Sequence, residues 1–97
     1  MHARIMSVQV QPGKEDDLTN IYRDSVIPAA NQQKGFKGGF LLADPNTGKC
    51  VSITLWETEA DMTAGEASGY LREQVAKLAP TFASPPVREG FEVRVQA

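Results

Sequence analysis

The sequence has 97 residues, of which 41% are hydrophobic and 23% are charged, the size and composition of one ordinary globular domain. Ten basic and twelve acidic residues give a net charge of −2 and are scattered along the chain, so a surface that binds nucleic acid is not expected. One cysteine excludes an internal disulfide, and one cysteine with one histidine cannot form a tetrahedral Cys/His zinc site. We therefore expect a single domain over residues 1–97, without zinc.

Membrane association is not expected either. The N-terminal residues lack the apolar core of a secretion signal, and no apolar run approaches the roughly 18 residues of a membrane span. The sequence thus predicts a soluble, cytoplasmic protein.

The first predicted elements are a strand and a helix. Residues 3–10 alternate between two sides, which is the period of a half-buried strand. Pro12-Gly13 breaks this pattern, and three acidic residues at 15–17 follow, where the positive end of a helix dipole favours carboxylates. An apolar stripe at helical spacing then predicts about four turns of helix, and Pro28 predicts an end or a bend near Ile27.

A hairpin follows the first helix. Glycines around Phe36 and Phe40 lead into Asp44-Pro45-Asn46-Thr47-Gly48, where proline fixes φ and glycine accepts a positive φ. The strand after the turn spans about Lys49 to Glu57 and has two chemically distinct faces. One face carries Val51, Ile53 and Leu55, and the other carries Cys50, Ser52, Thr54 and Trp56.

The last third of the chain predicts two helices and a strand. Thr58 with Asp61 approximates a capping box, and the sequence Gly65 to Gly69 divides a short helix from a longer one. Prolines end the second helix, and the alternation of Phe91, Val93 and Val95 with polar residues predicts a final strand.

The order of elements predicts an α+β fold. Strand, helix, strand, strand, helix, strand (βαββαβ) is the ferredoxin-like arrangement, with helices on one face of a four-stranded antiparallel sheet. The other face of the sheet then has no cover of its own, although each exposed large apolar side chain forgoes roughly 1.5 to 3 kcal/mol. Two sheets packed face to face would cover both faces, so we expect a homodimer.

Several motifs resemble those of the antibiotic biosynthesis monooxygenase (ABM) domain family. They are Gly35-Phe36-Lys37-Gly38 at the start of the second strand, the turn from Asp44 to Gly48, and Trp56-Glu57-Thr58-Glu59-Ala60 after the third. Pro12-Gly13-Lys14 also fits, and the resemblance covers nearly the whole chain. It implies a dimeric α+β barrel, and its members include oxygenases of phenols or anthrones that use neither metal nor flavin, haem-degrading enzymes, and enzymes of signalling metabolites.

The resemblance directs attention to four residues that we expect to bind a small aromatic substrate. Cofactor-free oxygenation needs an acidic phenol or enol and a water-poor pocket that stabilises its anion. Trp56 would form an aromatic wall, Tyr22 and Tyr70 would donate hydroxyl groups, and Arg4 would stabilise a phenolate. Each residue also has a structural interpretation. Trp56 and Tyr22 would be core residues. Arg4 would pair with Glu92 on a neighbouring strand, and for Arg4 we favour this structural role.

Haem degradation is not expected. That branch supplies a histidine from the helix after the tryptophan-bearing strand, whereas this chain has Glu66 there and no histidine between residues 60 and 79. The asparagine of that branch's first strand is also missing, because the region reads Ile5-Met6-Ser7. His2 is expected to be solvated and Cys50 to be a buried, inert thiol. The cluster of Gly35, Gly38 and Gly39 lacks the context of a phosphate loop, so no nucleotide is predicted. The resemblance to oxygenases that use neither metal nor flavin implies that no cofactor is needed.

The function predicted from these residues is a cofactor-independent monooxygenase acting on a phenolic or quinol-like compound. Two alternatives remain open. One is a dimer of the same fold that binds a small hydrophobic molecule without turning it over, and the other is an isomerase or an enzyme that processes a signalling metabolite. The fold is shared by all three.

Overall fold

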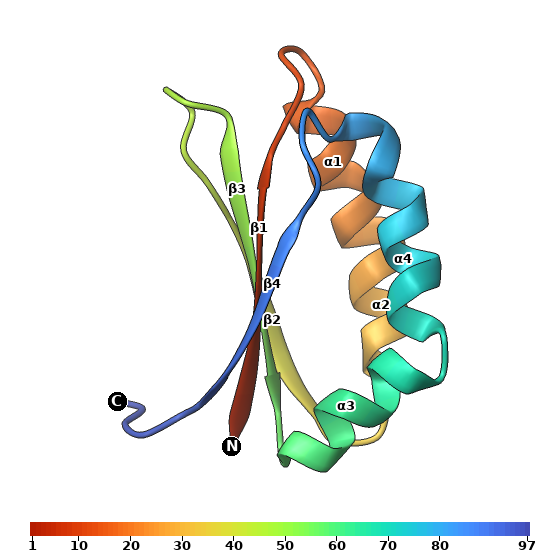
Figure 1. The fold of residues 1–97 in the computed structure, drawn as a ribbon, viewed down its shortest axis with the longest axis vertical. Coiled ribbons are helices and arrows are strands. Elements are labelled where there is room, and N and C mark those ends of the chain that lie inside the picture. The colour runs from red at the N-terminus through yellow and green to blue at the C-terminus, as the bar shows by residue number, and fades with distance from the viewer.

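The computed structural model describes residues 1–97 and consists of one sheet with a layer of helices on one face (Figure 1). The four strands are antiparallel neighbours in the order β2-β3-β1-β4. Their bounds are β1 His2–Gln9, β2 Phe36–Ala43, β3 Lys49–Trp56 and β4 Val87–Glu92. The predicted ferredoxin-like α+β fold is therefore confirmed.

The first helical segment contains a wide turn. It is made of α1 (Glu15–Ile21), the π-helical turn η1 (Tyr22–Val26) and α2 (Ile27–Asn31), in direct succession. Pro28 lacks the N–H that an α-helix would direct to the carbonyl four residues earlier, and the turn before it uses longer-range bonds such as Ile27 N–H to Tyr22 O. Of the predicted end or bend near Ile27, the end does not occur, because the helix continues as α2 to Asn31 after the local change.

Two helices follow β3 as predicted, but both have nine residues, whereas the second was expected to be the longer. Thr58 caps α3 (Glu59–Ala67) by accepting a hydrogen bond from Asp61 N at 3.0 Å, which confirms the predicted cap. Gly69 has a φ of +87° and turns the chain into α4 (Tyr70–Leu78), which continues into a single 3₁₀ turn, η2 (Ala79–Thr81).

The final strand follows the prolines as predicted but ends earlier than predicted. It begins at Val87, directly after the prolines, and ends at Glu92. Val93 donates its N–H to Met1 O at 2.9 Å outside the strand, and Val95 is 87% exposed. The expected alternation through Val95 was wrong for its last residues, because β1, the neighbour of β4, begins at His2, which lies opposite Glu92.

The two faces of the sheet differ in cover. The face under the helices holds Arg4, Thr54 and Trp56, all buried. The opposite face has no helix over it (Figure 1) and carries large apolar side chains, of which Phe40 and Phe91 are 56% and 52% exposed. The sequence alternation in β1 and β3 predicted this division correctly.

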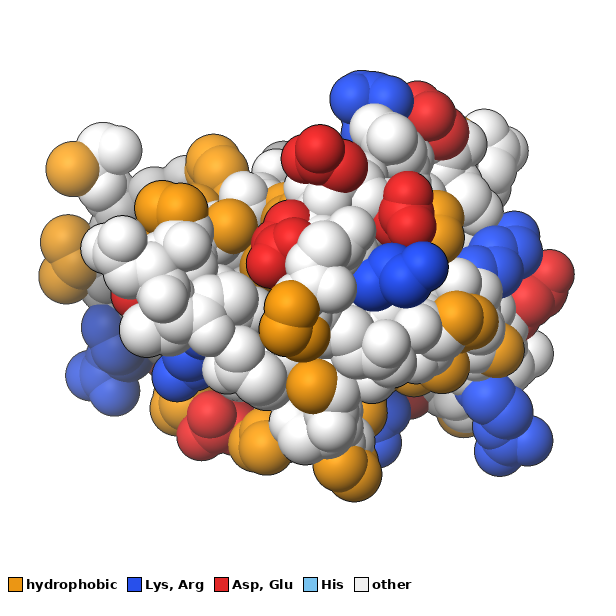
Figure 2. All heavy atoms as spheres, turned by 90° about the horizontal axis from the view of Figure 1, so that it is seen from above, with side chains coloured by type: hydrophobic (Ala, Val, Ile, Leu, Met, Phe, Trp, Pro, Cys, Tyr) orange, Lys and Arg blue, Asp and Glu red, His pale blue; other side chains and the backbone are white.

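Charged side chains do not gather into a patch of one sign on the face seen in Figure 2, where basic and acidic groups alternate. None of the helices is long and apolar enough to cross a lipid bilayer.

Candidate functional site

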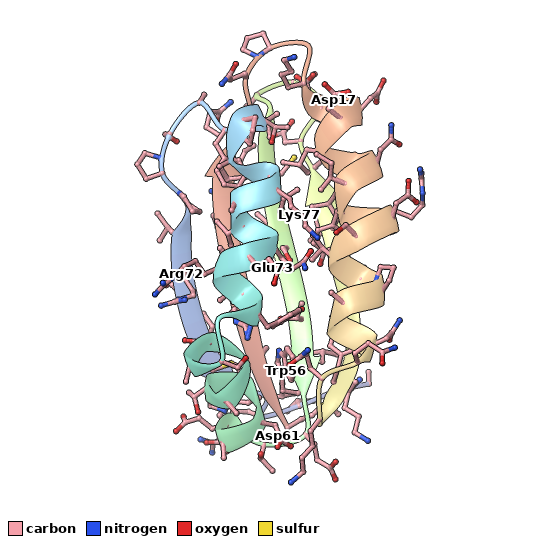
Figure 3. All side chains as sticks on the ribbon, turned by 90° about the vertical axis from the view of Figure 1, so that its right-hand side faces the viewer. Asp17, Trp56, Asp61, Arg72, Glu73 and Lys77 are labelled. Atoms are coloured by element: carbon pink, nitrogen blue, oxygen red, sulfur yellow. The ribbon has the colours of Figure 1, made fainter.

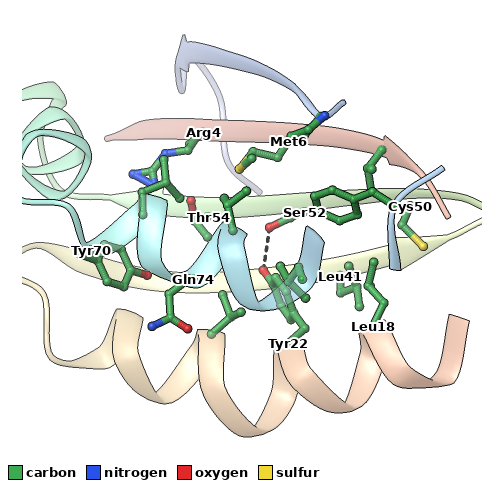
Figure 4. A pocket seen from close by; sticks show the side chains of 17 residues that line it. Arg4, Met6, Leu18, Tyr22, Leu41, Cys50, Ser52, Thr54, Tyr70 and Gln74 are labelled. Atoms are coloured by element: carbon green, nitrogen blue, oxygen red, sulfur yellow. Dashed lines mark hydrogen bonds between the residues drawn. The ribbon is translucent and has the colours of Figure 1, made fainter. Parts of the chain in front are cut away.

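A cavity lies between the helices and the sheet (Figure 4). Its volume is about 50 Å³ for water-sized occupants, several times the roughly 10 to 15 Å³ that one water needs. Most of its 17 lining residues are hydrophobic, so the few polar groups among them have defined positions in an apolar wall. Three of the four predicted site residues line it: Arg4, Tyr22 and Tyr70.

One end of the cavity is polar. Arg4 and Thr54 reach it from the sheet, and Tyr70 and Gln74 reach it from α4 (Figure 4). Gln74 is buried, and its Oε1 accepts a hydrogen bond from Ser25 Oγ at 3.1 Å. This end therefore combines a cation with hydroxyl and amide groups away from bulk water.

Tyr22 crosses the middle of the cavity. Its hydroxyl lies 2.8 Å from Ser52 Oγ and 3.3 Å from the carbonyl oxygen of Phe40, to which it donates. Because Tyr22 is the first residue of the π-helical turn, the position of its ring depends on that turn. Tyr22 consequently links the first helical segment to two strands, β2 and β3.

The other end of the cavity is apolar. Leu18, Leu41 and Cys50 meet there (Figure 4), and Val10, Leu18 and Cys50 form a buried cluster. Burial raises the pKa of the Cys50 thiol, with a smaller contribution in the same direction from Glu15. A neutral, buried thiol is what the sequence predicted.

Arg4 is the most unusual residue of the cavity, because its side chain is a charged group that is only 3% exposed. Its Nη2 donates to the carbonyl oxygen of Met62 at 3.2 Å, whereas its Nε is buried without a hydrogen-bond acceptor. Desolvation lowers the pKa of the guanidinium, and nearby Glu66 opposes that shift. Arginine is protonated at every physiological pH, so the cavity holds a permanent positive charge.

The carboxylate beside Arg4 is Glu66, not the predicted Glu92. Arg4 Nε lies 3.5 Å from Glu66 Oε2, and Arg88 Nη1 lies 3.7 Å from the other oxygen of the same carboxylate. Glu92 contacts Arg94 instead, at 4.0 Å. The prediction of an Arg4–Glu92 pair was wrong, because strand register places Gly90 opposite Arg4 and α3 brings Glu66 over the sheet.

Trp56 lies next to the cavity without lining it. The indole is fully buried, packs edge-on against Phe36 with centroids 5.4 Å apart, and donates its Nε1–H to Thr54 Oγ1 at 3.0 Å. The guanidinium carbon of Arg4 stands 5.2 Å from the centre of the ring. Trp56 therefore supports Arg4 from within the core.

Both tyrosines of the cavity are hydrogen-bond donors at neutral pH. Burial raises the pKa of Tyr22, partly offset by its bond with Ser52, and burial likewise raises the pKa of Tyr70, partly offset by Arg4. Neither hydroxyl loses its proton in the physiological range, so neither acts as a base.

His2 lies outside this cavity and is not solvated as expected. Its side chain is 15% exposed, with Nε2 3.2 Å from Glu59 Oε2 in the first turn of α3. No three or more histidine, cysteine, aspartate or glutamate side chains come together as a group that could hold a metal.

Sequence reasoning missed Ser52, Thr54 and Gln74 as cavity residues. The signal for Ser52 and Thr54 was their place on the Trp56 side of the third strand. The signal for Gln74 was its helical spacing from Leu71 and Leu78, which places a polar residue within an apolar stripe.

Comparisons with known proteins agree with this architecture. The family model described as "Antibiotic biosynthesis monooxygenase" matches residues 1–77. An uncharacterised protein of Mycobacterium tuberculosis is 32% identical over 97 residues, covering 96% of this chain and 41% of the relative. The chain thus spans about two-fifths of the length of that curated relative.

Two solved structures share the fold at low sequence identity. SnoaB, a cofactor-independent oxygenase of Streptomyces nogalater, superposes with a TM-score of 0.82 at 14% identity, covering 98% of this chain and 94% of its own. A monooxygenase from the ActVA-Orf6 gene of Streptomyces coelicolor, in complex with nanaomycin D, has a TM-score of 0.75 at 21% identity. The latter comparison covers 99% of this chain and 89% of the neighbour.

Proposed function

Because the chain belongs to the antibiotic biosynthesis monooxygenase family, we propose that it is a monooxygenase that oxidises a small phenolic or quinol-like compound without metal or flavin. The observation that carries the proposal is the buried guanidinium of Arg4 at the polar end of an otherwise apolar cavity. The descriptions of the two Streptomyces neighbours as oxygenases support the reaction class.

Arg4 stabilises the phenolate form of the substrate in this proposal. A phenol that loses its proton becomes a far better electron donor to O₂, and a cation in a water-poor site favours the charged form. The Nε of Arg4 makes no hydrogen bond and lies 3.5 Å from Glu66 Oε2, so the guanidinium is only loosely paired. Tyr70, whose hydroxyl is protonated, is placed to donate a hydrogen bond at the same end.

The proposed reaction balances with O₂ as the only co-reactant. A ring methylene conjugated to the phenolate loses both of its hydrogens and becomes a carbonyl. One atom of O₂ becomes the carbonyl oxygen, and the other leaves as water with the two hydrogens. The two C–H bonds supply the four electrons that O₂ takes up, so the substrate is the reductant.

The lining of the cavity limits the substrates that fit this reaction. No aspartate, glutamate or histidine is among the residues that line it. The proton of the substrate therefore passes to water, and the site suits compounds that are acidic already. An isomerase would need a base within hydrogen-bond reach of its substrate, so this alternative is less well supported.

The absence of a base from the cavity lining also supports a second candidate function, a protein that binds its ligand without turnover. A cavity with a cation and hydroxyl donors but no base can hold a small anionic aromatic molecule without reacting with it. Oxygen consumption separates the two: an oxygenase consumes O₂ above the uncatalysed rate with anthrones, which carry the ring methylene, whereas a binder changes their absorption spectra only.

We further propose that the protein is a homodimer joined through the uncovered faces of its sheets. Phe40, Leu42, Val87 and Phe91 are about half exposed on that side or its edges, and monomeric proteins rarely leave such apolar areas to water. A second copy of the same surface would cover them symmetrically.

A further inference from the structure

A second hollow lies directly beside the cavity, in the groove between α4 and the edge strand β4. It has a volume of about 470 Å³ and is lined by seven residues. Four of these seven also line the cavity: Met6, Leu71, Val75 and Pro86. The groove is therefore separated from the cavity only by side chains that both share.

A hollow on the other side of the cavity connects the cavity to solvent less well than the groove does. It lies between the first helical segment and β2, has a volume of about 300 Å³, and shares only Tyr22 and Leu41 with the cavity. Both of these side chains are fixed: Tyr22 by its hydrogen bonds and Leu41 within a strand. The α4–β4 groove is thus the better route from solvent.

Positive charge collects along that route. The three remaining groove residues are Glu66, Arg72 and Arg88, and Arg4 lies behind Glu66 at the end of the cavity. Three arginines and one glutamate give this path a formal charge of +2 in a chain whose net charge is −2. A local excess opposite to the net charge of the protein attracts anions specifically to this groove.

The arginines of the groove have hydrogen-bond donors that are not used within the protein. Arg72 belongs to no ion pair and donates no hydrogen bond, and it lies on the side of α4 that faces β4, away from Glu73 and Lys77 (Figure 3). Arg88 and Arg4 share one carboxylate, at 3.7 and 3.5 Å. Both distances exceed the roughly 2.7 to 2.9 Å of a charge-assisted hydrogen bond, so Glu66 saturates neither guanidinium.

We propose that the α4–β4 groove is the entrance to the cavity and that Arg72 and Arg88 bind a carboxylate of the ligand there. The ligand class is then an aromatic phenol that also carries a carboxylate: the phenol enters the cavity towards Arg4, and the carboxylate stays at the mouth. This rests on the proposed function in placing the substrate in the cavity, but it concerns binding and does not require turnover.

Two matched probes test the proposal: 3-hydroxy-2-naphthoate, which is a carboxylate at neutral pH, and 2-naphthol, which is neutral. Calorimetric titration of the wild-type protein at low salt should give about tenfold tighter binding of the carboxylate, and high salt should reduce the difference. Arg72→Gln should weaken the binding of the carboxylate probe about fivefold and leave the affinity for 2-naphthol unchanged. Arg88→Gln should act in the same direction.

Arg23→Gln is the control, since it removes the same exposed guanidinium from the first helical segment, where it pairs with Asp24, and should change neither affinity. Equal affinities of the two probes for the wild type, failure of the carboxylate to bind, or equal losses of both probes in Arg72→Gln would each overturn the proposal. Carboxylate selectivity without oxygen consumption would contradict the oxygenase function and leave this inference standing. Oxygen consumption without that selectivity would do the reverse.

Discussion

The guanidinium carbon of Arg4 lies 5.2 Å from the centre of the Trp56 ring, and both side chains are buried. A desolvated cation–π contact contributes about 2 kcal/mol, which offsets part of the cost of burying the charge. The Met62 carbonyl and the loosely held Glu66 carboxylate supply the remaining contacts. Arg4 is therefore held in place by the indole, the carbonyl group and the carboxylate together.

Replacing Arg4 by methionine should separate function from stability. Glu66 keeps Arg88 as a partner and is partly exposed, so the substitution strands no buried charge. We expect the free energy of unfolding to change by no more than about 1 kcal/mol, because removing the desolvation cost balances the lost contacts. Oxygen consumption should fall about a hundredfold, the effect of losing one stabiliser of a reactive anion.

Urea denaturation and the absorbance of bound 4-nitrophenol check this prediction. Wild-type protein should bind the coloured nitrophenolate below its solution pKa, and Arg4→Met should not. Arg23→Gln, which removes an exposed guanidinium paired with Asp24 in the first helical segment, is the matched control for the phenolate signal. Nitrophenol bound in its neutral form by the wild type would show that Arg4 does not stabilise the anion.

Trp56→Ala should cost about 3 to 5 kcal/mol of stability, the usual effect of truncating a buried tryptophan. Trp56→Phe should cost less, because it keeps an aromatic ring beside Phe36 and loses the hydrogen bond to Thr54. Thermal unfolding of both variants measures the difference. A Trp56→Ala protein with unchanged stability and no turnover would instead place the indole in the substrate site.

The two tyrosines should make stability fall in alkaline solution. Burial raises the pKa of both, so the folded protein keeps protons that the unfolded chain loses above pH about 10. Their contribution to the free energy of unfolding is complete below that pH and declines as pH rises towards the folded pKa values. Because the chain has only two tyrosines, tyrosinate absorbance reports them alone.

Titration of the native and the urea-unfolded protein gives the two midpoints directly. The native midpoint should be the higher one, and Tyr22→Phe should leave a single titrating group. A native midpoint equal to that of the unfolded chain would mean that both hydroxyls are solvated.

Phe40→Glu should convert the proposed dimer into a monomer, because it places a charge on the apolar surface that two copies would bury. Native mass spectrometry of the wild type should give twice the chain mass, and the variant should give one. Ala76→Glu, on the exposed side of α4, adds the same charge to the helix layer and should stay dimeric. A monomeric wild type would remove the proposed interface.

The elements of this fold follow from local patterns in the sequence. Alternation divided β1 and β3 into two faces correctly, and the Thr58–Asp61 spacing gave the start of α3, because these features depend on neighbouring residues. Pro28 predicted an end or a bend of the helix because it lacks the N–H of an α-helical hydrogen bond. The chain continues instead through a π-helical turn, which the missing N–H alone does not specify.

The candidate site was less predictable. Arg4 and Glu66 are 62 positions apart, and their contact depends on how α3 crosses the sheet after β3. Trp56 was expected in the wall of the cavity, but Arg4 and Thr54 form that part of the wall, and Trp56 packs behind Arg4. Such distances arise from tertiary packing, which no short motif encodes.

The most direct test of the proposed function is the fate of isotopically labelled O₂ with 1,8-dihydroxyanthrone and purified protein that has been treated with a metal chelator. The account predicts consumption of one O₂ per product, one labelled atom in the new carbonyl, and loss of the enzymatic rate in Arg4→Met. Product formed at the uncatalysed rate, or an Arg4→Met protein as active as the wild type, would contradict it.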